Sequence, residues 1–139
     1  MGRFKFCPAC GAAAPLVRET RRMKYRYKGE TLAVRQPGDW CRACGEAVLN
    51  HADVQATEDK LNAWRQRINK EIAVMIKQVR KELGLTQEEM AEIVGGGKKA
   101  FAKYESGTVI PSEAMIRLIR LLGKRPELLM DLRSMKKAA

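Results

Sequence analysis

The sequence predicts an α+β fold, in which a small cysteine-containing module with a β-hairpin precedes an all-α domain of five helices. Three observations support this prediction. All four cysteines of the 139-residue chain lie within its first 50 residues. In the same segment, apolar and basic residues alternate in short runs that are typical of strands. From residue 53 onward, proline is scarce and apolar residues recur at helical spacing.

The composition is strongly basic, with 27 Lys and Arg against 16 Asp and Glu and a formal net charge of +11. This excess predicts attraction to phosphate polyanions or to anionic membrane surfaces. No run approaches the roughly 18 apolar residues of a membrane-spanning helix, and the N-terminal segment lacks the apolar stretch of a signal peptide. We therefore expect a cytoplasmic protein, in which reducing conditions favour metal binding by the cysteines over two disulfides.

The cysteines form two CxxC pairs with 30 residues between them, and a glycine follows each pair directly. Two such knuckles supply four thiolates to one tetrahedral ion, so the sequence predicts one structural Zn²⁺ per chain. The predicted ligands are Cys7, Cys10, Cys41 and Cys44. A thioredoxin-like redox pair and two local disulfides are the alternatives, and the redox pair would need a βαβ unit that this segment lacks. His51, the single histidine, is expected to be a solvated or capping residue because the shell is complete without it.

Between the cysteine pairs, the sequence predicts a β-hairpin with one apolar and one basic face. Apolar and basic residues alternate over residues 23–28 and again over residues 32–35, and a turn at Lys28-Gly29-Glu30 separates the two runs.

A helix is expected to follow, with Asp53 as its N-cap and its end near Asn69. Its narrow apolar seam consists of Val54, Leu61, Trp64 and Ile68. We place the domain boundary after Asn69, which gives a zinc-binding domain over residues 1–69 and an α-helical domain over residues 70–139. No glycine or proline marks this boundary, so a continuous helix is an equal alternative.

The first two helices of the second domain are predicted from periodicity and caps. The first ends at Gly84 and carries an apolar stripe of Ile72, Met75, Ile76, Val79 and Leu83. Thr86 and Glu89 form a capping box that begins a short helix extending through Val94. The run Gly95-Gly96-Gly97 then requires a turn.

Three more helices complete the predicted domain. The third covers Lys98 to Glu105, with Phe101 and Tyr104 pointing inward. Ser112 caps the fourth, whose inward residues are Met115, Ile119 and Leu122. Pro126 opens the fifth, which carries Leu128, Leu129 and Leu132, and residues 135–139 are expected to be disordered.

Two short helices joined by a glycine turn, the second with outward lysines, are typical of a helix-turn-helix motif. In that motif the second helix enters the major groove, where lysine can donate to guanine O6 and N7. The candidate DNA-binding residues are Lys98, Lys99 and Lys103, with Gln87 as a phosphate contact at the preceding helix N-terminus. The alternative is that these lysines form an ordinary solvated helix face.

The residues also resemble known families. The segment Leu85–Gly95, followed by Lys103-Tyr104-Glu105-Ser106-Gly107 and by Pro111-Ser112, is similar to the Xre/Cro-type helix-turn-helix. The segment Gly95–Glu105, together with the two CxxC pairs, resembles the MqsA (YgiT-type) zinc-finger antitoxins along nearly the whole chain.

This resemblance implies the antitoxin of a type II toxin–antitoxin system. Its zinc domain would bind and neutralise an mRNA-cleaving ribonuclease toxin, and its C-terminal domain would dimerise and repress its own operon at a palindromic operator. The family reads bases through an Asn and an Arg, and these positions are Lys99 and Lys103 here. The six residues that precede Cys7 are a further departure, because family members start closer to the first cysteine.

Two other classes of function are alternatives to this one. The first is a zinc-ribbon Xre-type transcriptional regulator without a toxin partner. The second is an enzyme, which the sequence disfavours because a single histidine, a closed metal shell and the lack of a phosphate-binding glycine motif leave no catalytic set.

Overall fold

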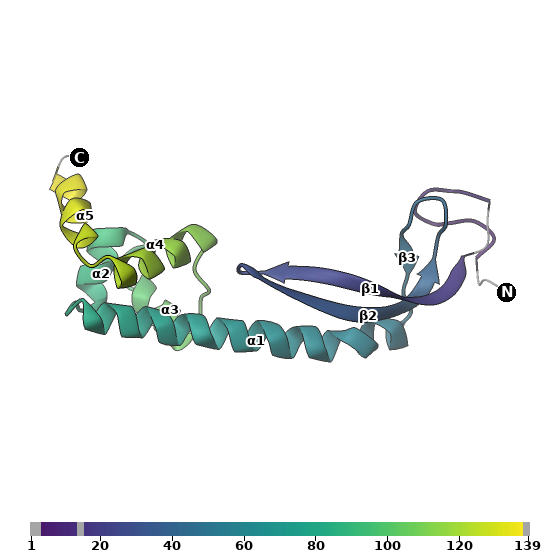
Figure 1. The fold of residues 1–139 in the computed structure, drawn as a ribbon, viewed down its shortest axis with the longest axis horizontal. Helices are drawn as coiled ribbons and strands as arrows, with labels where there is room; N and C mark the ends of the chain where they lie inside the picture. The colour runs from purple at the N-terminus through teal and green to yellow at the C-terminus, as the bar shows by residue number, and fades with distance from the viewer. Residues whose placement is uncertain (1–3, 14–15, 138–139) are drawn as a thin grey trace. The chain divides into compact units, whose positions relative to one another are not determined.

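The computed structural model describes residues 4–13 and 16–137. The chain forms two compact units, the first ending at Arg65 and the second beginning at Gln66. Helix α1, His51–Glu82, continues without a break from one unit into the other (Figure 1). The structure therefore contains the continuous helix that the sequence had left open, while the domain limits 1–69 and 70–139 stay a prediction. A three-stranded antiparallel sheet and five helices confirm the predicted α+β class.

The first unit is built on a long hairpin of β1, Val17–Tyr27, and β2, Glu30–Trp40. Lys28 and Gly29 connect the strands with φ of 47° and 87°, which is the left-handed conformation of a two-residue hairpin turn. The predicted hairpin is confirmed, but the strands are longer than the alternating segments because their polar ends also pair, Arg18 opposite Asp39. A short third strand, β3 at Ala47–Val48, pairs with the end of β2 and was not predicted.

The two faces of the hairpin differ as expected. Val34 is buried and Tyr25 is half-buried on one face, where Tyr27 makes an edge-to-face contact with Trp64 of α1 at 6.1 Å between ring centroids. The exposed opposite face is basic and carries Arg22, Lys24, Arg26 and Arg35. The hairpin thus buries its apolar face against the first half of α1.

The start of α1 corrects the predicted cap. The Asn50 side chain accepts a hydrogen bond from the Asp53 backbone N–H (2.9 Å), and the Asp53 carboxylate accepts one from the Asn50 N–H (3.0 Å). Asn50 is therefore the N-cap of a reciprocal capping box, and Asp53 is the third residue of the helix. The prediction of Asp53 as N-cap was wrong. Asn and Asp both cap helices, so the sequence does not show whether Asn50 or Asp53 is the N-cap, whereas the contacts of Asp53 do.

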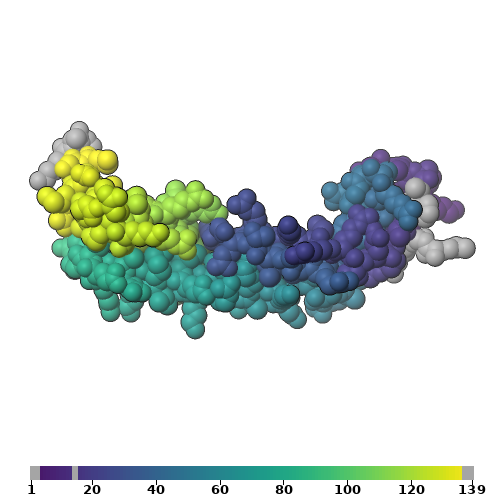
Figure 2. All heavy atoms as spheres, in the orientation of Figure 1, coloured from purple at the N-terminus to yellow at the C-terminus, as the bar shows by residue number. Residues whose placement is uncertain are grey.

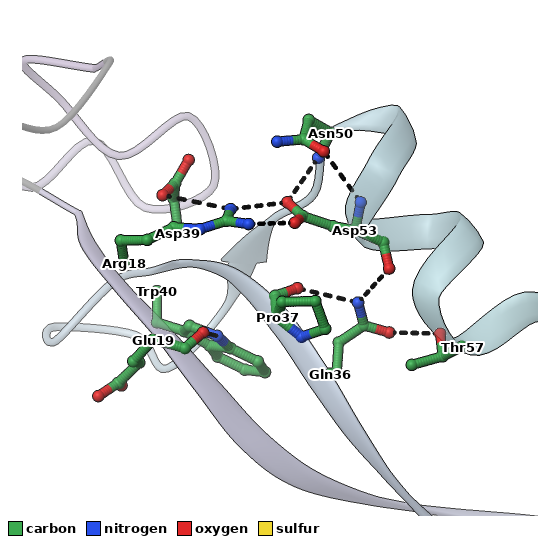
Figure 3. Close-up of polar contacts among 9 residues, drawn as sticks. All are labelled: Arg18, Glu19, Gln36, Pro37, Asp39, Trp40, Asn50, Asp53 and Thr57. Carbon is green, nitrogen blue, oxygen red and sulfur yellow. Dashed lines mark hydrogen bonds and ion pairs between the residues drawn. The ribbon is translucent and has the colours of Figure 1, made fainter.

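Asp53 is buried, its side chain being 1% exposed, and it forms a bidentate ion pair with Arg18 of β1 (Figure 3). The hydrogen bond from Arg18 lowers the pKa of Asp53 and keeps the buried carboxylate charged. Beside it, Gln36 of β2 donates to the Asp53 carbonyl at 2.7 Å and accepts from the Thr57 hydroxyl at 2.8 Å. A polar network therefore joins both long strands to the first turns of α1.

This network explains a second correction. Val54 was predicted to lie in the apolar seam, but it is 39% exposed because Asp53 and Thr57 occupy the sheet-facing positions of the first two turns. From the next turn onward, Leu61, Trp64 and Ile68 are buried as predicted.

The second unit contains the end of α1 and four shorter helices. These are α2, Gln87–Val94; α3, Ala100–Ser106; α4, Glu113–Lys124; and α5, Leu128–Lys137. Both predicted caps are present: Thr86 and Glu89 form the capping box of α2, and the Ser112 hydroxyl accepts from the Met115 N–H. The fully buried core combines Ile76 with side chains of α2, α3 and α4, namely Met90, Phe101, Ile119 and Leu122.

Helix α4 packs closely on α1 because residue 123 is a glycine. A Cβ atom at Gly123 would lie only 2.9 Å from a methyl group of Val79. Figure 2 shows the yellow-green and yellow atoms of α4 and α5 beside the teal atoms of the preceding helices.

Four details of the helices differ from the predictions. Helix α3 begins at Ala100 rather than Lys98. In the first turn of α4, Ile116 is buried and Met115 is half-buried. Helix α5 begins at Leu128, two residues after Pro126, and extends to Lys137, so the disorder expected from Met135 was wrong up to that residue. Residues 138–139 lie outside the described part of the chain. None of the described helices has both the length and the apolar character needed to cross a membrane.

Candidate metal centre and nucleic-acid interface

The four predicted ligand cysteines lie together. All pairs of their Sγ atoms are within 4.8 Å of one another, and Cys7–Cys44 and Cys10–Cys41 are each separated by 3.8 Å. In a tetrahedron of sulfurs around an ion with bonds of about 2.3 Å, neighbouring sulfurs are about 3.8 Å apart, so these two separations match those around a tetrahedral Zn²⁺. Cys7 and Cys41 are buried, whereas Cys10 and Cys44 are exposed. The arrangement is a four-cysteine metal-binding site.

The two knuckles share one backbone pattern. In each, the N–H of the following glycine donates to the carbonyl of the first cysteine, Gly11 to Cys7 at 2.8 Å and Gly45 to Cys41 at 2.9 Å. Both glycines have positive φ, 74° and 79°, which explains why glycine follows each pair. His51 is exposed at the start of α1 and is not part of the cluster.

Backbone donors already favour a thiolate in this cluster. The N–H groups of Cys44 and Ala43 outweigh desolvation and lower the pKa of Cys41 to about 6. For Cys44, desolvation and the neighbouring thiols outweigh the lowering by the Glu46 N–H and raise the pKa to about 12. Four neighbouring sulfurs cannot all carry charge without a cation, so the site is built for a metal ion.

The second candidate site lies around α2 and α3. Gly95, Gly96 and Gly97 have φ of 89°, 104° and 89° and form the predicted turn. The three predicted lysines, Lys98, Lys99 and Lys103, line one surface hollow together with residues 96–97, Ala100, Tyr104 and Val109. The structure therefore gathers these lysines on one side of α3.

Gln87 has a different environment. It is the first residue of α2, and its side-chain amide donates to Glu105 at 2.9 Å. Glu105 also receives two hydrogen bonds from Arg80 of α1, one of them at 3.1 Å. Burial raises the pKa of Glu105, but the bonds from Arg80 and Gln87 outweigh this effect and lower it. This contact fixes α3 to α1 and α2.

Sequence reasoning missed both ionic contacts of this site. Arg80 and Glu105 are 25 residues apart, so no local pattern in the sequence connects them. The other contact joins the Lys98 ammonium to Glu88 at 3.8 Å. Only the folded packing of α1, α2 and α3 reveals these partners.

Comparisons with known proteins identify the family of the chain. Residues 5–133 match the family model for the MqsA antitoxin, the antitoxin component of a bacterial toxin–antitoxin system. Over 130 residues the chain is 35% identical to Antitoxin MqsA of Escherichia coli K12, which covers 91% of the chain and 98% of that protein. The chain belongs to the MqsA antitoxin family.

Two shorter similarities concern other proteins. The chain is 45% identical over 51 residues to an uncharacterised HTH-type transcriptional regulator of Methanothermobacter thermautotrophicus, covering 36% of the chain and 74% of the regulator. It is also 32% identical over 69 residues to multiprotein-bridging factor 1a of Arabidopsis thaliana, covering 49% of each. This member of the MqsA family thus combines a four-cysteine metal site with a helix-turn-helix of the transcription-regulator type.

We expect removal of bound metal by a chelator to unfold the first unit. Its buried cluster of Cys7, Leu16 and Cys41 contains two of the ligands, so metal loss also removes the local core. Trp40 and Trp64, the only tryptophans, are both in this unit, so their fluorescence should shift to longer wavelength. Zinc should restore the spectrum, and Cys10→Ser should resemble the stripped protein. An unchanged spectrum after verified metal loss would contradict this expectation.

We expect the Arg80–Glu105 contact to make the second unit sensitive to acid. Because the folded-state pKa of Glu105 lies below its ordinary value of about 4.3, its stabilisation is complete above that pH and is lost as the pH falls through the folded-state pKa. Glu105→Gln should lower the free energy of unfolding by about 3 kcal/mol at neutral pH and make it less dependent on pH between about pH 5 and 3. Urea unfolding followed by circular dichroism would measure both effects.

The matched control is Glu113→Gln. Glu113 forms an exposed ion pair with Arg117 at 3.6 Å, so this variant should lose less than about 1 kcal/mol of unfolding free energy. Its stability should still fall steeply as the pH is lowered. Equal effects of the two substitutions would show that the buried contact does not hold α3.

Proposed function

We propose that this chain is the antitoxin of a type II toxin–antitoxin system and represses its own operon. Its zinc-binding domain, residues 1–69, would neutralise a ribonuclease toxin, and its helix-turn-helix domain, residues 70–139, would bind operator DNA. The observation that carries the proposal is the family match over residues 5–133, which includes both the four-cysteine site and α3. The proposed role is binding and not catalysis, and the proposed compartment is the cytoplasm, where thiols stay reduced.

For the first domain, the proposal assigns one structural Zn²⁺ to Cys7, Cys10, Cys41 and Cys44. Sulfur separations of 3.8 Å support this ion, and four protein ligands leave no coordination position for a substrate. The ion would hold the knuckles in place, so that the module can present a toxin-binding surface.

For the second domain, α3 would enter the major groove. Lys98, Lys99 and Lys103 would contact bases, with guanine as the preferred acceptor, and Gln87 at the N-terminus of α2 would contact a phosphate. A homodimer formed through this domain would place two α3 helices on a palindromic operator with half-sites about 34 Å apart.

The alternative is a zinc-ribbon transcriptional regulator without a toxin partner. The similarity to an HTH-type regulator favours this function specifically. Both functions require the same DNA binding, so they differ only in the first domain.

We expect Lys103→Ala to weaken operator binding by about 1 to 3 kcal/mol, and Lys99→Ala by a similar amount, because each would remove a donor to base edges. Gel-shift titrations at matched salt would measure the loss. Lys60→Ala, an exposed change in the first half of α1, serves as a control for net charge and should have a smaller effect. Unchanged affinity in both α3 variants would refute α3 as the recognition helix.

Co-expression separates the antitoxin from the regulator. If a toxin reading frame lies beside this one, its product should arrest growth alone and be neutralised by the full chain. Cys7→Ser should abolish the rescue, while the Lys103→Ala variant should still rescue because the toxin-binding domain is intact. Failure of the intact chain to rescue would leave the regulator function in place of the antitoxin.

A further inference from the structure

The outward face of α3 presents few side chains, which limits what it can recognise. Phe101 is buried, and Tyr104 and Glu105 are half-buried. The exposed residues are Ala102, Lys103 and Ser106, together with Lys99 at the N-cap position. Base contacts through α3 must therefore come from this small set.

Ser106 already uses its hydroxyl within the protein. Its Oγ donates to the Lys103 carbonyl at 3.1 Å and lies 2.8 Å from the Thr108 hydroxyl. The remaining outward residues, Lys99, Ala102 and Lys103, have the spacing of i, i+3 and i+4, so they are neighbours on one helix face.

The chemistry of these three residues is simple. A lysine ammonium offers only donors, and guanine presents two acceptors, O6 and N7, in the major groove. Ala102 offers only a methyl group, and among the four bases only thymine places a methyl group in that groove. The apolar stems of the flanking lysines would help to exclude water from a contact between two methyl groups.

We infer that Ala102 is a specificity-determining residue that selects thymine through its C5-methyl group, beside a guanine contacted by Lys99 or Lys103. The inference rests on the proposed DNA binding and assigns the operator half-site a guanine accompanied by a thymine. Ala102 supplies selectivity without charge, whereas the lysines supply most of the attraction to DNA.

The test begins with selection of bound sequences from a random DNA pool by the full zinc-loaded chain. Each thymine of the selected half-site is then replaced singly by deoxyuridine, which lacks only the methyl group. At one position the replacement should weaken binding about fourfold per half-site, the value of one buried methyl group. In Ala102→Gly the same replacement should have no effect.

The unchanged chain and Ala102→Gly are each measured on DNA with thymine and on DNA with deoxyuridine. Because only the loss of affinity caused by deoxyuridine is compared, any destabilisation of α3 by the glycine cancels. Ala114→Gly, an exposed change in α4, is the matched control and should keep the full fourfold loss. If selection enriches no sequence, the proposed DNA binding fails. If a sequence is enriched but no thymine shows the loss, or the loss persists in Ala102→Gly, the assignment of Ala102 is overturned and the DNA-binding function stands.

Discussion

The first unit depends on the convergence of four sulfurs from two distant parts of the chain. Cys7 and Cys44 are 37 residues apart, and the whole hairpin lies between them. The Lys28-Gly29 turn closes one end of the hairpin, and the cysteine cluster closes the other. Because Cys7 and Cys41 also belong to the small buried cluster with Leu16, two of the four ligands are part of the local core. We therefore expect metal binding and folding of this module to be coupled.

A buried charge then attaches this module to α1. Asp53 is the third residue of the helix, and its carboxylate serves the capping box with Asn50 and the ion pair with Arg18 together. An unpaired carboxylate at this depth would be costly, so the strand and the helix start stabilise each other only in this arrangement. The bonds from Gln36 to the Asp53 carbonyl and to Thr57 extend the constraint to β2.

The sequence predicted features that depend on near neighbours. The two knuckles, the hairpin turn and the Thr86 and Ser112 caps are each encoded within a few residues, and the structure contains all of them. Prediction from the sequence failed where a residue distant in the chain decides whether a side chain is buried or paired. Asp53 and Thr57 are buried only because Arg18 and Gln36 face them, and this displaces Val54 to the surface. In the same way, Arg80 is recognised as the partner of Glu105 only from the packing of α1 against α3.

The lysines of the proposed DNA site differ in whether a carboxylate of the second unit already pairs with them. Glu105 is committed to Arg80 and Gln87, which holds α3 in place without using a lysine. Glu88 lies within 3.8 Å of the Lys98 ammonium, so that charge is already partly balanced. Among the described residues, no carboxylate pairs with Lys99 or Lys103. In the proposed complex a phosphate or guanine would have to displace Glu88 at Lys98, so we expect Lys99 and Lys103 to contribute more to the affinity for DNA.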